Sequence, residues 1–183
     1  MIWLVLLAIV ALLGLWAIGI YNGLVRLRTV VGEAWSGIDA QLKRRTNLIP
    51  NLVETVKGYA AHERQTFEEL TQLRAKGGGE EDVAKRAETE SAITAAIGKV
   101  MAVAEAYPDL KASANFQSLQ KDLAEIEDQI QLARRYYNGA VRDLNVKVQQ
   151  FPSNLVANWG GFKTAAFFQI EEQDRAVPKV SFS

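Results

Sequence analysis

The sequence predicts an all-α protein in which an N-terminal transmembrane helix is followed by an antiparallel bundle of long helices. The first observation behind this prediction is a strongly apolar stretch without charge over residues 1–25. The second is the recurrence of apolar residues every three or four positions along most of the remaining chain, which is the spacing of one helix face. Pro is scarce, with four in the chain, which also favours helix over sheet.

Residues 2–20 are almost entirely Leu, Ile, Val, Ala and Trp, and no charged side chain occurs before Arg26. At about 1.5 Å of rise per residue, a helix of this length reaches roughly 30 Å, the hydrocarbon thickness of a bilayer. We therefore predict a membrane anchor over residues 1–25. The aromatic and basic residues expected at its two membrane–water interfaces are Trp3, Trp16, Tyr21, Arg26 and Arg28.

The charges around the anchor predict its orientation. Basic residues follow the apolar stretch and none precedes it, which favours a single-pass cell-membrane protein with a cytoplasmic body and the N-terminus outside. A translocated body is the alternative orientation. The alternative to the anchor itself is a cleaved signal peptide, because Ala17 and Gly19 resemble a cleavage site, although the apolar run is longer than that of a signal peptide.

Residues 26–152 are predicted to form the helical bundle. The first helix continues out of the anchor, and Pro50 is expected to break or kink it because proline has no backbone N–H to donate. A second helix is expected over 51–76, stopped by the three glycines at 77–79. A third is expected over 82–106, with acidic residues at its start.

The clearest helix follows, with Ser113 or Asn115 as its N-cap. Its apolar residues step by three and four, with one extra four-residue step from Tyr137 to Val141, which describes a heptad seam with a single stutter. Pro152 is expected to stop it. The predicted seam consists of Phe116, Leu119, Leu123, Ile126, Ile130, Ala133, Tyr137, Val141, Leu144, Val148 and Phe151.

The C-terminal part divides into an aromatic-rich segment over 153–170 and a polar tail over 171–183, which we expect to be mobile. The aromatic rings are expected to cap the open end of the bundle, with insertion into a membrane interface as the alternative. The basic run at 43–45 is expected to be a solvated face, with contact to anionic lipid as the alternative. The residues considered for contact with lipid or a protein partner are Lys43, Arg44, Arg45, Trp159, Phe162, Phe167 and Phe168.

The composition of the chain excludes several classes of binding and catalytic site. Lys plus Arg and Asp plus Glu both number 21 in 183 residues, so the basic surplus typical of nucleic-acid binding is missing and no such partner is expected. The chain has no Cys, which excludes disulfides, thiolate metal sites and cysteine nucleophiles. The only histidine, His62, cannot face its neighbour Glu63 on a helix, so no catalytic, metal or cofactor site is predicted.

Several distinctive stretches follow one another along the chain: AWSGID at 34–39, QLKRR at 41–45, NLIPNLVETVKGY at 47–59, EAYPDLK at 105–111, ARRYYN at 133–138, FPS at 151–153 and GF at 161–162. Together they resemble the LemA family of bacterial membrane proteins, and the resemblance covers the chain from Met1 to around Ile170. The resemblance implies a single N-terminal span with a short outside N-terminus and a soluble antiparallel helical bundle. It implies no established catalytic activity and supplies no active-site residues.

From these observations we hypothesise a non-enzymatic, membrane-anchored helical scaffold or adaptor that acts through protein–protein contacts at the cytoplasmic membrane. Its partners would be the membrane and an unidentified protein or a second copy of the chain. The alternative is a membrane-organising or remodelling protein that binds the lipid surface through basic and aromatic residues. A third hypothesis, a hydrolase, requires that activity be lost when His62 or a specific carboxylate is replaced.

Overall fold

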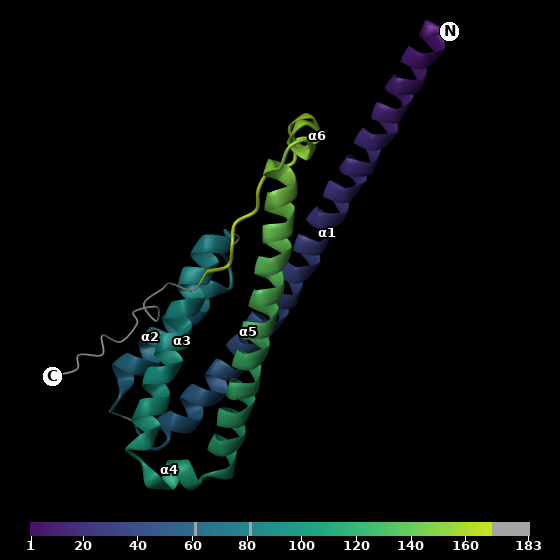
Figure 1. The fold of residues 1–183 in the computed structure, drawn as a ribbon. Coiled ribbons are helices and arrows are strands. Elements are labelled where there is room, and N and C mark those ends of the chain that lie inside the picture. The colour runs from purple at the N-terminus through teal and green to yellow at the C-terminus, as the bar shows by residue number, and fades with distance from the viewer. Residues whose placement is uncertain (61, 81, 170–183) are drawn as a thin grey trace, which may run out of the picture. The chain divides into compact units, whose positions relative to one another are not determined.

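The computed structural model describes residues 1–60, 62–80 and 82–169, and these residues form helices and connecting segments without a β-strand. The predicted all-α fold class is confirmed. The helices are α1 (Ile2–Lys57), α2 (Arg64–Gly77), α3 (Val83–Glu105), α4 (Pro108–Ala112), α5 (Ala114–Gln149) and α6 (Ser153–Trp159) (Figure 1). The tail predicted over 171–183 lies outside the described residues.

The chain divides into two compact units, and the two longest helices, α1 and α5, contribute to both. Unit 1 contains Met1–Asp39 and Leu132–Phe167. Unit 2 contains Ala40–Gln131 and Phe168–Ser183, and Phe168 and Gln169 are the described residues of its second part. The domain boundaries at residues 25, 152 and 170 remain predictions.

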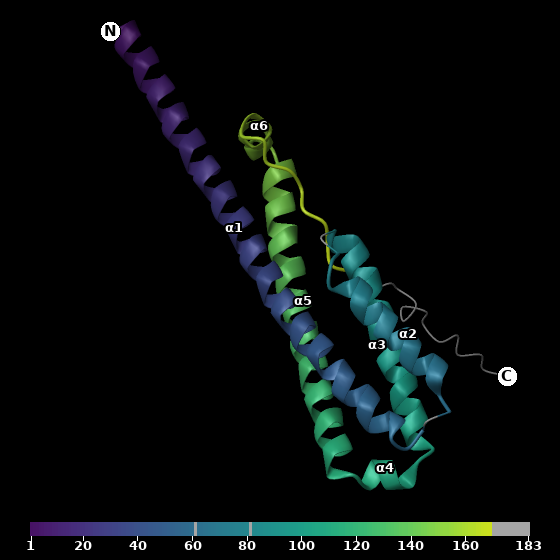
Figure 2. The ribbon, with the colours of Figure 1, turned by 180° about the vertical axis from the view of Figure 1, so that it is seen from behind.

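Unit 2 is a helical bundle in which α2 and α3 lie side by side as an antiparallel pair (Figures 1 and 2). Asp82, one of the acidic residues expected at the start of α3, is its N-cap, because its carboxylate accepts a hydrogen bond from the backbone N–H of Lys85 at 3.0 Å. Apolar side chains from five helices make its core. The buried members are Ile49, Leu52, Val56, Ala60, Phe67, Leu70, Ile93, Ala96, Val100, Ala104, Leu110, Phe116 and Leu123.

Pro50 was expected to break or kink the helix, but α1 continues through Pro50 and ends at Lys57, so the predicted break is wrong. Pro50 has no N–H to donate to the carbonyl of Thr46, the residue four positions earlier. That carbonyl instead accepts a hydrogen bond from Nε of Arg74 on α2 at 3.2 Å. A second helix therefore supplies the donor that the proline lacks. The single helix predicted over 51–76 is also wrong, because a turn after Lys57 separates α1 from α2.

The seam predicted along α5 is confirmed over most of its length. The seam residues from Phe116 to Val148 are buried or half-buried. Phe151 is the exception: α5 ends at Gln149, and the Phe151 side chain is 74% exposed. Helix α4 was not predicted, although its first residue, Pro108, has a fixed φ that suits the first turn of a helix.

Unit 1 packs α1, from Ala17 onward, against the second half of α5 and against α6, around Leu24, Leu144, Val156 and Phe162. After α6 the chain turns at Gly161, whose φ of 68° lies in the left-handed region that favours glycine. It then runs back along α5 (Figure 1).

Two polar side chains of α5 hold this returning segment. The Asn145 side chain accepts from the backbone N–H of Ala165 at 2.8 Å and donates to the carbonyl of the same residue at 3.0 Å. The Tyr137 hydroxyl donates to the carbonyl of Ala166 at 2.9 Å. Burial raises the pKa of Tyr137 above its ordinary value, because the phenolate would lose hydration.

Candidate functional site

One helix of the described part of the chain, α1, is long and apolar enough over its N-terminal region to cross a membrane. None of its most apolar 18-residue stretch is buried within the structure. A row of exposed Leu, Ile and Val side chains is unfavourable in water and favourable in hydrocarbon, where the helix also satisfies its own backbone hydrogen bonds. This feature indicates a membrane-associated protein.

Helix α6 lies beside the last turns of this apolar stretch, and an open groove of about 780 Å³ separates the two helices. We call it the α1–α6 groove. The chain is closely packed at Gly160, which lines the groove. A Cβ there would lie 2.8 Å from Cε2 of Phe162 and 3.1 Å from Cε2 of Tyr21. The residues that line the groove are Gly14, Ala17, Ile18 and Tyr21 of α1, with Leu155, Val156, Trp159 and Gly160.

An aromatic pair joins the two sides next to the groove. The rings of Tyr21 and Phe162 meet edge to face, with centroids 5.3 Å apart and an interplanar angle of 74°. The guanidinium carbon of Arg28 lies 5.2 Å from the centroid of the Phe162 ring, within range of a cation–π interaction. The segment after α6 is thereby attached to α1 where its charge-free stretch ends.

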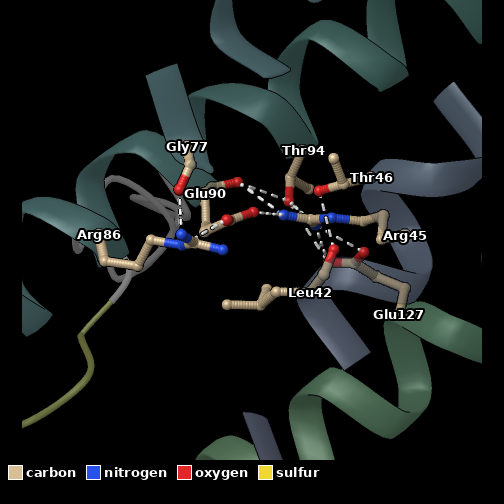
Figure 3. A network of polar contacts seen from close by, with 8 residues as sticks. All are labelled: Leu42, Arg45, Thr46, Gly77, Arg86, Glu90, Thr94 and Glu127. Carbon is tan, nitrogen blue, oxygen red and sulfur yellow. Dashed lines mark hydrogen bonds and ion pairs between the residues drawn. The ribbon is translucent and has the colours of Figure 1, made fainter. Parts of the chain in front are cut away.

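Unit 2 contains a buried cluster of charged side chains, which we call the ionic cluster (Figure 3). Arg45 of α1 is 1% exposed, and its guanidinium contacts Glu90 of α3 at 2.5 Å and Glu127 of α5 at 2.9 Å. It also donates to the Thr94 hydroxyl at 2.6 Å and to the Glu90 carbonyl at 3.2 Å. One side chain of α1 thus reaches two other helices of the unit.

Glu90 is shared by a second guanidinium. Its other carboxylate oxygen lies 2.8 Å from Nε of Arg86, four residues earlier on α3, and Arg86 also donates to the carbonyl of Gly77 at the end of α2 (Figure 3). Two positive and two negative side chains balance one another. The carboxyl group of Glu90 is 1% exposed, so a substrate in solution does not reach it. We assign the cluster to holding the helices of unit 2 together.

The residues predicted for membrane or partner contact separate into two groups. Nine of them are exposed: Trp3, Trp16, Tyr21, Arg26, Arg28, Lys43, Arg44, Trp159 and Phe167. Three are buried: Arg45, Phe162 and Phe168. The expectation of a solvated face is wrong at Arg45, because this residue lies on the same face of α1 as the buried Leu42 and Ile49.

The sequence did not predict two features, the burial of Arg45 and the packing of α6 beside the anchor. The burial of Arg45 was signalled by its position three residues after Leu42 and four before Ile49, in line with the apolar stripe. The pairing of α6 with the anchor was signalled by charge: no charged residue occurs between Lys147 and Lys163, so this segment and residues 1–25 are the two longest uncharged stretches of the chain.

No group of three or more His, Cys, Asp or Glu side chains within the described ranges is arranged to hold a metal ion. His62 is exposed, and so is its neighbour Glu63.

The fold and the exposed apolar stretch of α1 together define the class of protein: an all-α protein with an N-terminal apolar helix of membrane-spanning length.

Comparison with known proteins identifies its family. A model of the LemA family matches residues 34–182. The chain is 31% identical over 159 residues to Protein LemA of Metamycoplasma hominis, a match that covers 86% of this chain and 73% of that protein. This chain belongs to the LemA family, as the sequence resemblance implied. The match continues to residue 182, so the tail, which was expected to lie outside the resemblance, is part of it.

Two further relatives have a different name. The chain is 27% identical over 175 residues to Magnetosome protein MamQ 2 of Paramagnetospirillum magneticum, and 24% identical over 174 residues to Magnetosome protein MamQ of Magnetospirillum gryphiswaldense. Each match covers 81% of this chain and 64% of the relative, so the chain spans less than two thirds of their length. None of these names states an enzymatic activity.

Proposed function

We propose that this protein is a non-enzymatic, membrane-anchored helical scaffold or adaptor, with its body on the cytoplasmic side, that acts through protein–protein contacts. The observation that carries the proposal is a set of three large, exposed apolar side chains on α5. Leu132, Tyr136 and Val146 are 50%, 61% and 52% exposed, and their spacing puts them on one side of the helix. The buried Tyr137 and Val141 lie on the other side.

The interior of unit 2 supports the same role. Its buried charged side chains are occupied with one another in the ionic cluster, and Glu90, the most enclosed carboxylate there, has two guanidinium partners. Such an arrangement fixes the helices and leaves the exposed faces to make contacts. The partner is a helix of another protein or of a second copy of this chain, because an apolar helical stripe pairs readily with another helix.

Site-specific photocrosslinking in native membranes tests the proposal. A photoreactive amino acid at Tyr136 in the full chain should give a crosslinked product of higher mass, which mass spectrometry then identifies. The matched control is the same amino acid at Gln72, an exposed polar position on α2. A chain that remains monomeric and without partners from Tyr136, or that gives the same products from both positions, would contradict the scaffold role.

The alternative function, organisation of the lipid surface by basic and aromatic residues acting together, has weaker support. Arg45 is buried in the ionic cluster, so only Lys43 and Arg44 of the basic run are available at the surface. Trp159 supports the part of this hypothesis that concerns aromatic residues, because its side chain is 84% exposed and can contact lipid. Binding of the full-length protein to a second layer of vesicles would favour this alternative.

A further inference from the structure

The segment around α6 lies at the level of the membrane anchor in unit 1. The groove contacts on α1 run from Gly14 to Tyr21, which are about two turns in the second half of the anchor predicted over residues 1–25. At about 1.5 Å per residue, these turns cover roughly 10 Å along the helix axis. Because α6 lies against them, a bilayer that surrounds this part of α1 also meets α6.

The chemistry of α6 suits that position. No charged side chain occurs between Lys147 and Lys163, so insertion of this segment into the boundary between headgroups and hydrocarbon carries no charge-burial cost. Its largest exposed side chains are apolar: Leu155 is 60% exposed and Trp159 84% exposed. Tryptophan is enriched at this boundary, where its ring contacts acyl chains and its N–H finds a polar partner.

The α1–α6 groove therefore opens where acyl chains, and not water, surround the protein. Its walls are apolar, and Gly14 leaves room on α1, since a Cβ built there has no neighbour within 4 Å. Cations follow on the adjacent turns: Arg26 and Arg28 are exposed, and Arg28 lies over the ring of Phe162. An apolar slot that leads along α1 toward Arg28, with Arg26 on a neighbouring turn, matches the acyl chain and the negatively charged phosphate of a phospholipid.

We propose that the α1–α6 groove holds an acyl chain of an anionic phospholipid, with Trp159 at the level of the glycerol backbone and Arg26 and Arg28 facing the headgroup. This lipid site goes beyond the scaffold role and does not depend on it. Helix α6 then acts as a second, shallow membrane contact beside the anchor, and it limits the depth and tilt at which α1 sits.

Depth-dependent fluorescence quenching tests the position of Trp159. The full chain carries Trp3→Phe, Trp16→Phe and Trp35→Phe, which leaves Trp159 as the only tryptophan, and is reconstituted in vesicles of phosphatidylcholine and phosphatidylglycerol. Bromine on the upper acyl carbons should quench the emission, and aqueous iodide should not. A second measurement avoids the three other substitutions. The wild-type chain is compared with a variant that carries Trp159→Phe alone, and this variant should lose part of the emission that bromine quenches. Iodide quenching without bromine quenching overturns the proposal.

Two matched glycine variants test the groove itself. Gly14→Leu fills the groove, whereas Gly19→Leu adds the same side chain to the same helix at a position that does not line it. Neither new Cβ meets a neighbour within 4 Å. Gly14→Leu should lose the phosphatidylglycerol that native mass spectrometry detects on the detergent-solubilised protein, and Gly19→Leu should keep it. Equal retention by the two variants overturns the groove assignment.

A second copy of the chain is the competing occupant of the groove. If its helix filled the groove, bromine quenching of Trp159 would be weak at a high protein-to-lipid ratio and would rise on dilution with lipid. That result overturns the assignment to lipid, whereas quenching independent of dilution supports it. Crosslinking at Tyr136, which tests the scaffold role, is a separate measurement, so either proposal can fail alone.

Discussion

The two units of the protein stabilise their interiors by different means. Unit 2 buries three charged side chains, Arg45, Arg86 and Glu90, in its ionic cluster, and the half-buried Glu127 completes the cluster. Unit 1 joins its elements by the hydrogen bonds of the Tyr137 hydroxyl and the Asn145 amide, by the edge-to-face pair of Tyr21 and Phe162, and by the cation–π contact of Arg28 with Phe162. Three of these four contacts are between neutral groups, and the fourth places a cation over a ring rather than against a carboxylate. A buried charge needs a complete set of partners, whereas a neutral hydrogen bond is less costly to lose.

The largest effect is expected in the ionic cluster. Glu90→Gln removes the negative charge between Arg45 and Arg86, so the two guanidinium groups stay buried with only Glu127 to balance them. Breaking a buried pair in this way costs about 3–5 kcal/mol of unfolding free energy. Denaturant titration of the full chain in detergent, followed by circular dichroism, measures it.

The control for this variant is Glu69→Gln, which removes the exposed ion pair with Lys99 at 2.8 Å. An exposed pair contributes about 0–1 kcal/mol, because water and side-chain entropy offset its attraction. Equal losses from Glu90→Gln and Glu69→Gln would show that the cluster is not enclosed as described.

A smaller effect is expected at the close approach of Gly160. Gly160→Ala places a Cβ 2.8 Å from the Phe162 ring, which must move, and overpacking of this kind costs about 1–3 kcal/mol. The same substitution at Gly98, on the exposed side of α3, meets no neighbour within 4 Å and should stabilise the helix by up to about 1 kcal/mol. The two variants should therefore shift the denaturation midpoint in opposite directions, and a shared sign would refute the crowding at Gly160.

Tyr137→Phe tests a neutral contact of unit 1. It removes the hydrogen bond to the Ala166 carbonyl and should cost about 1 kcal/mol, measured by denaturant titration at pH 7. Burial raises the pKa of Tyr137 above 10.0, so the unfolded chain loses this proton at a lower pH than the folded chain. The stabilisation is present below pH 10 and is lost as the pH rises through the folded pKa. Above pH 10 the wild type should therefore lose more stability than Tyr137→Phe, and parallel pH profiles would contradict this assignment.

The smallest effect concerns the donor that replaces the missing N–H of Pro50. Arg74→Met removes the hydrogen bond to the Thr46 carbonyl and should cost no more than about 1 kcal/mol in unfolding free energy. In a Pro50→Ala background the backbone N–H of residue 50 satisfies that carbonyl, so the cost of Arg74→Met should shrink. A double-mutant cycle measures this coupling, and additive effects would mean that Arg74 does not substitute for the proline.

The sequence predicted those parts of the fold that depend on neighbours along the chain. The apolar stripe of α5 and the acidic start of α3 follow from the local sequence, and both are confirmed, the latter by Asp82 at the N-cap. The break expected at Pro50 was wrong because the compensating donor, Arg74, lies 28 residues after Thr46, whose carbonyl it satisfies. The burial of Arg45 was missed for the same reason, since its partners Glu90 and Glu127 lie 45 and 82 residues further along.

In the candidate site, too, the sequence predicted what depends on a single residue and not what depends on residues far apart in the chain. Trp159 was recognised as a candidate for lipid contact from its residue type, and the side chain is exposed. Its place beside Gly14 could not be predicted, because the two residues are far apart in the chain and no periodicity connects α1 to α6. Only the uncharged character of both segments links them in the sequence.

The charge balance of the ionic cluster has one further consequence. Arg45, Arg86, Glu90 and Glu127 sum to zero, and dissolved ions do not enter the space between Arg45 and Glu90. Mobile ions screen exposed charges over about 8 Å at physiological ionic strength, but they screen enclosed pairs much less. The helical body should therefore keep its fold through changes in the surrounding salt concentration, while any attraction of its surface arginines to a negatively charged bilayer would weaken as the salt concentration rises.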